Sequence, residues 1–175
     1  MFLPGTPVPE IRTGGDMLRT VSEQRIEVTR WIDAEPATIF DVLRDPHGHV
    51  AIDSSGMLMD ATGEPVETVG HRFTVHMDRE ALGDRPLGRY DVDVVITVYE
   101  PDREIAWTIE GQAQPYIGHV YGYRLEPDDD GARVVSYLDW SAIHPAWAEH
   151  EIFPVVPEQV LKATLGILAR NVQKN

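Results

Sequence analysis

The stretch PVVPEQVLKATLGILARNV, residues 154–172, has the spacing of a long helix with one buried face. Its apolar side chains recur three and four positions apart and fall on one broad arc of a helical wheel, away from Glu158, Lys162 and Arg170. Pro157 suits the first turn of a helix, where its missing N–H costs no bond. A long amphipathic helix that closes a chain needs a surface to lie against, so the segments before it decide the fold.

Most of the preceding chain has the alternation of antiparallel strands. Seven strands are predicted, at residues 25–32, 57–61, 71–77, 89–99, 104–109, 119–126 and 133–141. Turn-forming segments rich in Gly, Pro and Asp separate the last six, with no room for helical crossovers. Residues 33–44 have helical spacing that ends at Asp45-Pro46, and a second short helix is predicted near 49–52. The pattern predicts an α+β protein with a curved antiparallel sheet of about six to seven strands, two short helices after the first strand, and a long C-terminal helix across the sheet.

The length of 175 residues fits one domain with a sizeable core. Residues 1–22 mix Pro, Gly and Thr with isolated apolar residues, which predicts a flexible tail or arm, and residues 23–175 are expected to form the single domain. No apolar run approaches the roughly 18 residues of a membrane span, and the first residues lack the features of a signal peptide. We therefore expect no membrane insertion and a cytoplasmic location.

The formal net charge of −14 disfavours nucleic acids and anionic lipid surfaces as partners, because both are bound mainly through Lys and Arg. The absence of cysteine excludes disulfides and thiolate chemistry. Seven histidines are present, but none forms an HExxH pair or a similar metal-binding motif. No metal and no cofactor are predicted, and the chain is expected to be a monomer or a homodimer.

Three stretches resemble the START-like (SRPBCC) superfamily, in particular its polyketide cyclase/dehydrase-like bacterial branch. They are RWIDAEPATIFDVLRDPHGHVAID at 30–53, YEPDREIAW at 99–107 and GYRLEPDDDGARVVSYLDWS at 122–141. The resemblance implies the helix-grip (Bet v 1-like) fold, in which a curved sheet grips the C-terminal helix around a cavity. It also implies binding or transport of a small hydrophobic molecule, lipid-like or polyketide-like. Ala132 departs from the threonine that often follows the hairpin turn of this branch.

The strand predicted at 119–126 places His119, Tyr121 and Tyr123 on one face. Large rings with polar tips are typical of a pocket whose few polar groups orient an apolar ligand. A hydrogen-bonded aromatic core is the alternative interpretation of the same pattern. The predicted ligand-binding residues are Tyr90, Trp107, His119, Tyr121, Tyr123, Trp140, Thr164, Leu165 and Leu168.

Catalysis is the second hypothesis: a polyketide cyclase, aromatase or dehydratase type of enzyme, with His119 and Tyr121 as catalytic candidates. His76 and Asp139 are further candidates for a general base, although alternation turns Asp139 outward if His119 faces inward. Residues 144–153, which include Trp147 and Phe153, are either a lid over the cavity or an ordinary packing loop. A protein-interaction module is a third, weaker alternative.

Overall fold

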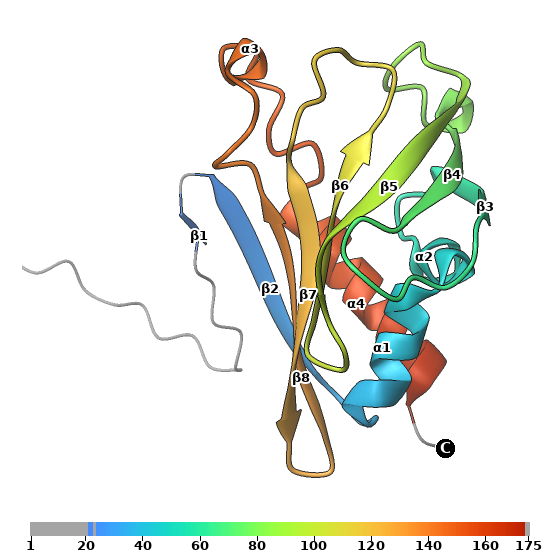
Figure 1. Cartoon of the computed structure of the whole chain (residues 1–175), viewed down its shortest axis with the longest axis vertical. Coiled ribbons are helices and arrows are strands. Elements are labelled where there is room, and N and C mark those ends of the chain that lie inside the picture. The colour runs from blue at the N-terminus through green and yellow to red at the C-terminus, as the bar shows by residue number, and fades with distance from the viewer. Residues whose placement is uncertain (1–20, 23, 174–175) are drawn as a thin grey trace, which may run out of the picture.

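The computed structural model describes residues 21–22 and 24–173, and it contains one antiparallel sheet of eight strands (Figure 1). The strands are β1 (Val21–Ser22), β2 (Arg25–Ile32), β3 (Leu58–Thr62), β4 (Arg72–Asp78), β5 (Arg89–Glu100), β6 (Glu104–Glu110), β7 (Val120–Asp128) and β8 (Gly131–Asp139). Their order across the sheet is β1-β2-β8-β7-β6-β5-β4-β3, so only the β2–β8 pairing joins strands far apart in the sequence. The predicted α+β helix-grip fold is confirmed.

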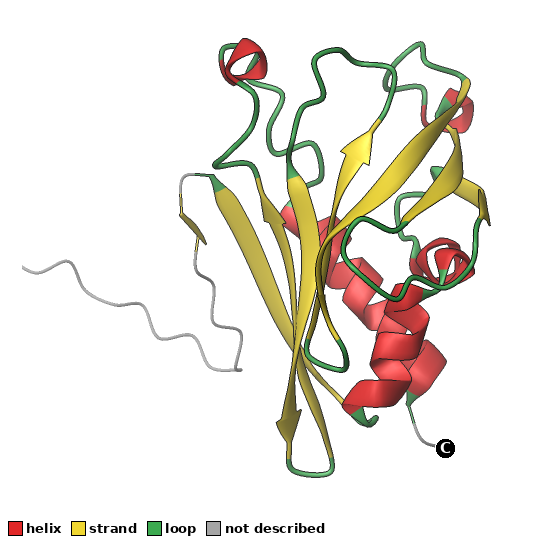
Figure 2. Ribbon diagram, viewed as in Figure 1, coloured by secondary structure: helices red, strands yellow, loops and turns green. Residues whose placement is uncertain are grey.

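The helices are α1 (Pro36–Arg44), α2 (Pro46–Ile52), the 3-10 helix η1 (Glu80–Leu82), α3 (Pro145–Ala148) and α4 (Glu158–Val172). Figure 2 shows α1, α2 and α4 on one side of the sheet, with α4 running behind its central strands. The side chains that α1 and α4 turn toward the sheet are fully buried, Leu43 and Leu168 among them. This buried face is what the amphipathic spacing of 154–172 predicts.

The C-terminal helix begins at Glu158, later than the predicted start at residue 154. Pro157 is its N-cap, with an extended backbone at ψ 158°. Proline disfavours the helical conformation in the residue before it, so Pro154 and Pro157 together keep residues 153–156 out of the helix. Lys162 and Glu158 form an ion pair of 2.5 Å on the exposed side of the first turns.

The two short helices after β2 meet at Asp45. Its backbone is extended, which ends α1, and its carboxylate accepts a hydrogen bond of 2.9 Å from the backbone N–H of His47, which caps α2. Because of this cap α2 begins at Pro46, three residues before the predicted segment. The elements η1 and α3 were not predicted, since three or four residues are too few to show a helical period.

Two details of the strands correct the predicted pattern. Strict alternation along residues 89–99 predicts Val98 on the buried face, but a bulge in β5 lies between Ile96 and Val98. Tyr99 turns inward instead and meets the ring of Phe40. The turn between the predicted strands 119–126 and 133–141 is shorter than expected, because Pro127 pairs with Ala132 and Asp128 with Gly131. Only Asp129 and Asp130 lie between β7 and β8. Pro127 is tolerated there because β7 has passed the end of β6 at Glu104.

Strand β1 lies within the segment predicted to be a tail. Val21 and Ser22 pair with Ile26 and Arg25, so these two residues belong to the sheet. The rest of the predicted tail, residues 1–20, lies outside the described residues. None of the helices in the described ranges is long and apolar enough to cross a membrane.

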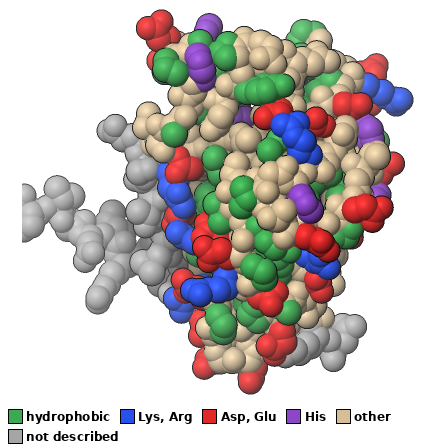
Figure 3. Space-filling model, in the orientation of Figure 1, with side chains coloured by type: hydrophobic (Ala, Val, Ile, Leu, Met, Phe, Trp, Pro, Cys, Tyr) green, Lys and Arg blue, Asp and Glu red, His purple; other side chains and the backbone are tan. Residues whose placement is uncertain are grey.

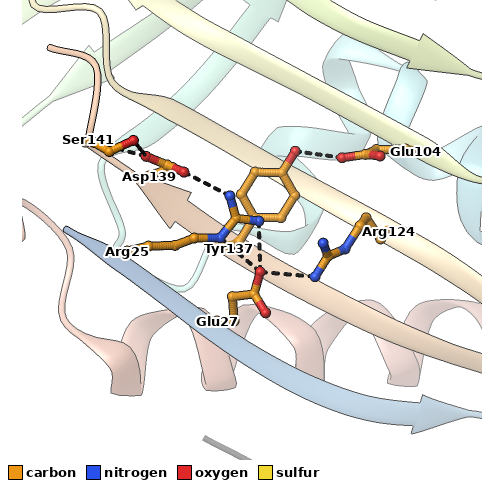
Figure 4. A network of polar contacts seen from close by, with 7 residues as sticks. All are labelled: Arg25, Glu27, Glu104, Arg124, Tyr137, Asp139 and Ser141. Carbon is orange, nitrogen blue, oxygen red and sulfur yellow. Dashed lines mark hydrogen bonds and ion pairs between the residues drawn. The ribbon is translucent and has the colours of Figure 1, made fainter. Parts of the chain in front are cut away.

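The outer face of the sheet carries a polar network that spans β2, β8, β7 and β6 (Figure 4). Arg25 lies over the ring of Tyr137, 4.3 Å from its centre, and forms ion pairs of 2.7 Å with both Glu27 and Asp139. Tyr137 is only 4% exposed, and its hydroxyl donates to Glu104. Figure 3 shows charged side chains of both signs interspersed with apolar ones over the face toward the viewer.

Candidate functional site

An aromatic cluster occupies the inner face of β6 and β7. The register places Trp107 opposite Tyr121, and alternation turns both toward the same side as Tyr123. The ring of Trp107 stacks on those of Tyr121 and Tyr123, with centres 6.3 and 6.0 Å apart. Trp107 and Tyr123 are buried and Tyr121 is half-buried, so the cluster becomes more open toward the N-terminal end of β7.

His119 lies at that more open end, immediately before β7. Its backbone carbonyl accepts a 2.8 Å hydrogen bond from the Thr108 hydroxyl, which fixes this residue against β6. The imidazole ring contacts Tyr121 on one side, at 5.4 Å between ring centres, and Phe153 on another, at 5.3 Å. Phe153 in turn stacks on Trp140, with centres 5.7 Å apart and planes 10° from parallel. The rings of Tyr121, Phe153 and Trp140 thus form a connected cluster with His119, and Phe153 belongs to the segment for which a lid and a packing loop are the two predicted alternatives.

The Nδ1 atom of His119 is buried and has no hydrogen-bond partner among the described residues. The residue is 7% exposed, and this burial lowers the pKa of its imidazole to about 4. The ring is therefore neutral near pH 7. A buried polar atom without a partner costs about 1–3 kcal/mol, which a ligand that bonds to it would recover.

Both tyrosines on the same face keep their phenolic protons. Burial raises the pKa of Tyr121, against the opposing effect of the positive charge on Arg79. Burial also raises the pKa of Tyr123 to about 12, although a hydrogen bond with Ser136 counteracts part of this. At neutral pH the inner face therefore offers hydroxyl donors and a neutral imidazole.

The sequence reasoning missed two residues that shape this site. His49 of α2 is buried, bonds through Nε2 to the carbonyl of Leu43 at 2.8 Å, and meets the ring of Trp107 edge-on at 4.6 Å. Arg79, which precedes η1, has a side chain only 19% exposed. Strand β4, which directly precedes Arg79, is long enough to be predicted from the sequence. Nothing in the sequence indicates that the loop after β4 directs Arg79 toward Tyr121.

The remaining predicted ligand-binding residues divide into two groups. Tyr90 and Trp140 are half-buried, and Trp140 stacks on Phe153 next to His119. Leu165 and Leu168 are buried at 1% and 0% exposure in the core between α4 and the sheet. The hydroxyl of Thr164 lies 2.8 Å from that of Ser54, which ties α4 to the loop after α2. The structure therefore brings Trp140 to the rings around His119, whereas Leu165 and Leu168 belong to the core under α4.

The other candidate bases, His76 and Asp139, lie on the outer face of the sheet. His76 is bonded to Asp91 at 2.7 Å and to Thr62 at 2.8 Å. Burial alone would raise the pKa of Asp139, but hydrogen bonds from Ser141 and Arg25 outweigh it and lower this pKa. Both side chains are thus separated by the sheet from His119. Within the described part of the chain, His, Asp and Glu side chains form no group of three or more that could hold a metal ion.

Comparisons with solved structures support the fold. Protein CV1439 from Chromobacterium violaceum superposes with a TM-score of 0.62 at 15% identity, over 88% of this chain and all of that one (100%). Protein Ms6760 from Mycobacterium smegmatis gives a TM-score of 0.61 at 15% identity, over 90% of this chain and 96% of that one. The Aha1 protein from Colwellia psychrerythraea, solved as a dimer, gives 0.58 at 19% identity, over 85% and 96%.

A comparison with curated proteins gives no significant match. The family model described as polyketide cyclase / dehydrase and lipid transport matches residues 23–173, which is nearly the whole of the predicted domain and includes every element from β2 to α4. The sheet and its three covering helices agree with that match. The chain belongs to the polyketide cyclase / dehydrase and lipid transport family.

Proposed function

We propose that this protein binds a small hydrophobic molecule at the open end of the aromatic cluster, where His119 orients it. The observation that carries the proposal is the buried, unpartnered Nδ1 of His119 among the rings of Tyr121, Phe153 and Trp140. Ligand sites are mostly apolar with few convergent polar groups, and this cluster has that composition. The family's description, which includes lipid transport, supports a lipid-like or polyketide-like ligand.

The first test uses the purified protein and one simple probe. Native mass spectrometry followed by solvent extraction is expected to find a co-purified apolar species. Titration calorimetry with decan-1-ol is expected to show saturable binding. His119→Phe keeps a ring of similar size but loses the hydrogen bond, so affinity should fall about tenfold.

The matched control is His76→Phe, which makes the same change on the outer face and should leave binding as in the wild type. Wild-type protein that carries no extractable species and takes up no decan-1-ol would contradict the proposal. Equal affinities in His119→Phe and the wild type would place the ligand elsewhere.

A second candidate function is catalysis of the cyclase, aromatase or dehydratase type. It is favoured by the neutral imidazole of His119 beside the protonated hydroxyl of Tyr121, an arrangement of base and acid. A pKa of about 4 makes His119 a weak base at pH 7, which is why we place binding first. Turnover of a poly-β-ketone mimic that is lost in His119→Ala would reverse this order.

A further inference from the structure

Arg79 is a cationic side chain at the open end of the aromatic cluster. Its backbone is fixed by a 2.9 Å hydrogen bond to the carbonyl of Gly88, so the loop that carries η1 holds it in place. The side chain is 19% exposed, whereas that of its partner Asp84 is 43% exposed. The guanidinium thus lies deeper than the carboxylate that pairs with it.

The ion pair with Asp84 uses only part of the guanidinium. The Nε atom donates to one carboxylate oxygen at 3.2 Å, and Nη2 forms a short bond with the other. Nη1 takes no part in this pair. Arginine can bind two carboxylates at once, since its planar fork has five N–H donors.

Two tyrosines of the inner face interact with Arg79. The ladder pairs Met77 with Tyr90, so alternation turns Tyr90 and Arg79, two residues after Met77, toward the same side of the sheet. The side chain of Asp84 and, to a lesser extent, that of Tyr90 raise the pKa of Arg79. Burial raises the pKa of Tyr121, and the positive charge of Arg79 acts against this effect. The ring of Tyr121 contacts His119. One cation and two hydroxyls therefore lie on the same side of the sheet as the ring cluster, whose His119 has an unpartnered Nδ1.

We infer that the ligand of this site is an amphiphile with a carboxylate head, which Arg79 receives between Tyr90 and Tyr121 while the apolar body lies against His119, Phe153 and Trp140. The inference rests on the proposed function and adds the chemical class of the ligand. A carboxylate matches the planar guanidinium, and the two hydroxyls supply further donors to its oxygens. Asp84 competes with the ligand for the same cation from the solvent side.

The test compares two probes of equal chain length, decanoate and decan-1-ol, by titration calorimetry at pH 7. Wild-type protein should bind decanoate at least about tenfold more tightly than decan-1-ol. Hydrogen bonds to a charged group are stronger than those to a neutral group by a free energy that corresponds to about this factor. Arg79→Met should remove this preference and leave decan-1-ol affinity nearly unchanged. Asp84→Asn should increase decanoate affinity several-fold, since it removes the competing carboxylate.

Arg89→Met is the matched control, because Arg89 stands next to Tyr90 but is 83% exposed and paired with Asp78. It removes the same charge and should keep the preference for decanoate. If Arg79 and Asp84 only clamp the loop, both variants weaken both probes alike, and that result overturns the inference. Equal binding of the two probes by the wild type also overturns it but leaves apolar binding intact. Binding of neither probe overturns the proposed function itself.

Discussion

His119 and His49 are two imidazoles that burial keeps neutral, each with a pKa of about 4. An exposed histidine has a pKa of about 6.5, so between these values the unfolded chain binds protons that the folded chain does not. The contribution of these two neutral histidines to the free energy of unfolding is therefore fully present above about pH 6.5, and it is lost as the pH drops toward 4. The difference amounts to at most about 3 kcal/mol for each histidine.

Urea unfolding at pH 7 and pH 5 checks this pH dependence. His119→Phe cannot take up the proton, so it should lose less stability between the two pH values than the wild type does. His150→Asn, a change at an exposed histidine, should behave as the wild type. An identical pH response in His119→Phe and the wild type would show that His119 is not held neutral.

Leu165 tests the buried side of the C-terminal helix. It is 1% exposed, so Leu165→Asp places an unpaired carboxylate in the core and removes an apolar side chain. We expect a loss of at least about 3 kcal/mol in the free energy of unfolding, and no uptake of decan-1-ol. Ala163→Asp, an exposed position on the same helix, serves as the control in thermal melts. An unchanged melting temperature in Leu165→Asp would remove Leu165 from the core.

At the scale of elements, Gly122 of β7 leaves the space that the ring of Tyr137 of β8 occupies. A Cβ atom at Gly122 would lie 2.3 Å from Cζ of Tyr137, whose ring lies flat on the outer face at this point. Gly122→Ala should therefore cost about 1–3 kcal/mol through overpacking. In the Tyr137→Ala background the same change should cost almost nothing, and a double-mutant cycle measures this coupling.

Gly111→Ala is the control for that cycle, because its added Cβ meets the nearest side chain, Val92, at an ordinary 3.4 Å. Additive effects of Gly122→Ala and Tyr137→Ala would show that the ring does not rest on the glycine.

The elements that the sequence predicts well are those with a long, uninterrupted period. The alternation at 25–32 gives β2 with its correct bounds, and the helical spacing before Asp45-Pro46 gives α1. The bulge in β5 leaves no mark on the alternation around Thr97, because it is set by pairing with β6. The elements η1 and α3 follow from loop geometry and tertiary contacts that a local pattern does not contain.

At the scale of the molecule, the same distinction separates the predicted part of the site from the missed part. Tyr121 and Tyr123 lie on β7 and His119 immediately precedes it, so alternation alone predicts that the three share a face. Arg79 and His49 reach the cluster from a loop and a helix, and their positions depend on how distant segments pack. From the sequence alone, the simplest interpretation of Arg79 is a solvated surface charge, because arginine is rarely buried.

The two edges of the sheet bear on how this chain could associate with a second copy of itself. A sheet edge can pair with another chain when it offers a long, regular row of free backbone groups. At one edge the structure describes only the two residues of β1, and at the other β3 has five residues interrupted by an irregular register between Leu58 and Asp60. The β3 edge is therefore a poor template for strand addition. A homodimer of this protein is not expected to join two copies of β3 into one continuous sheet.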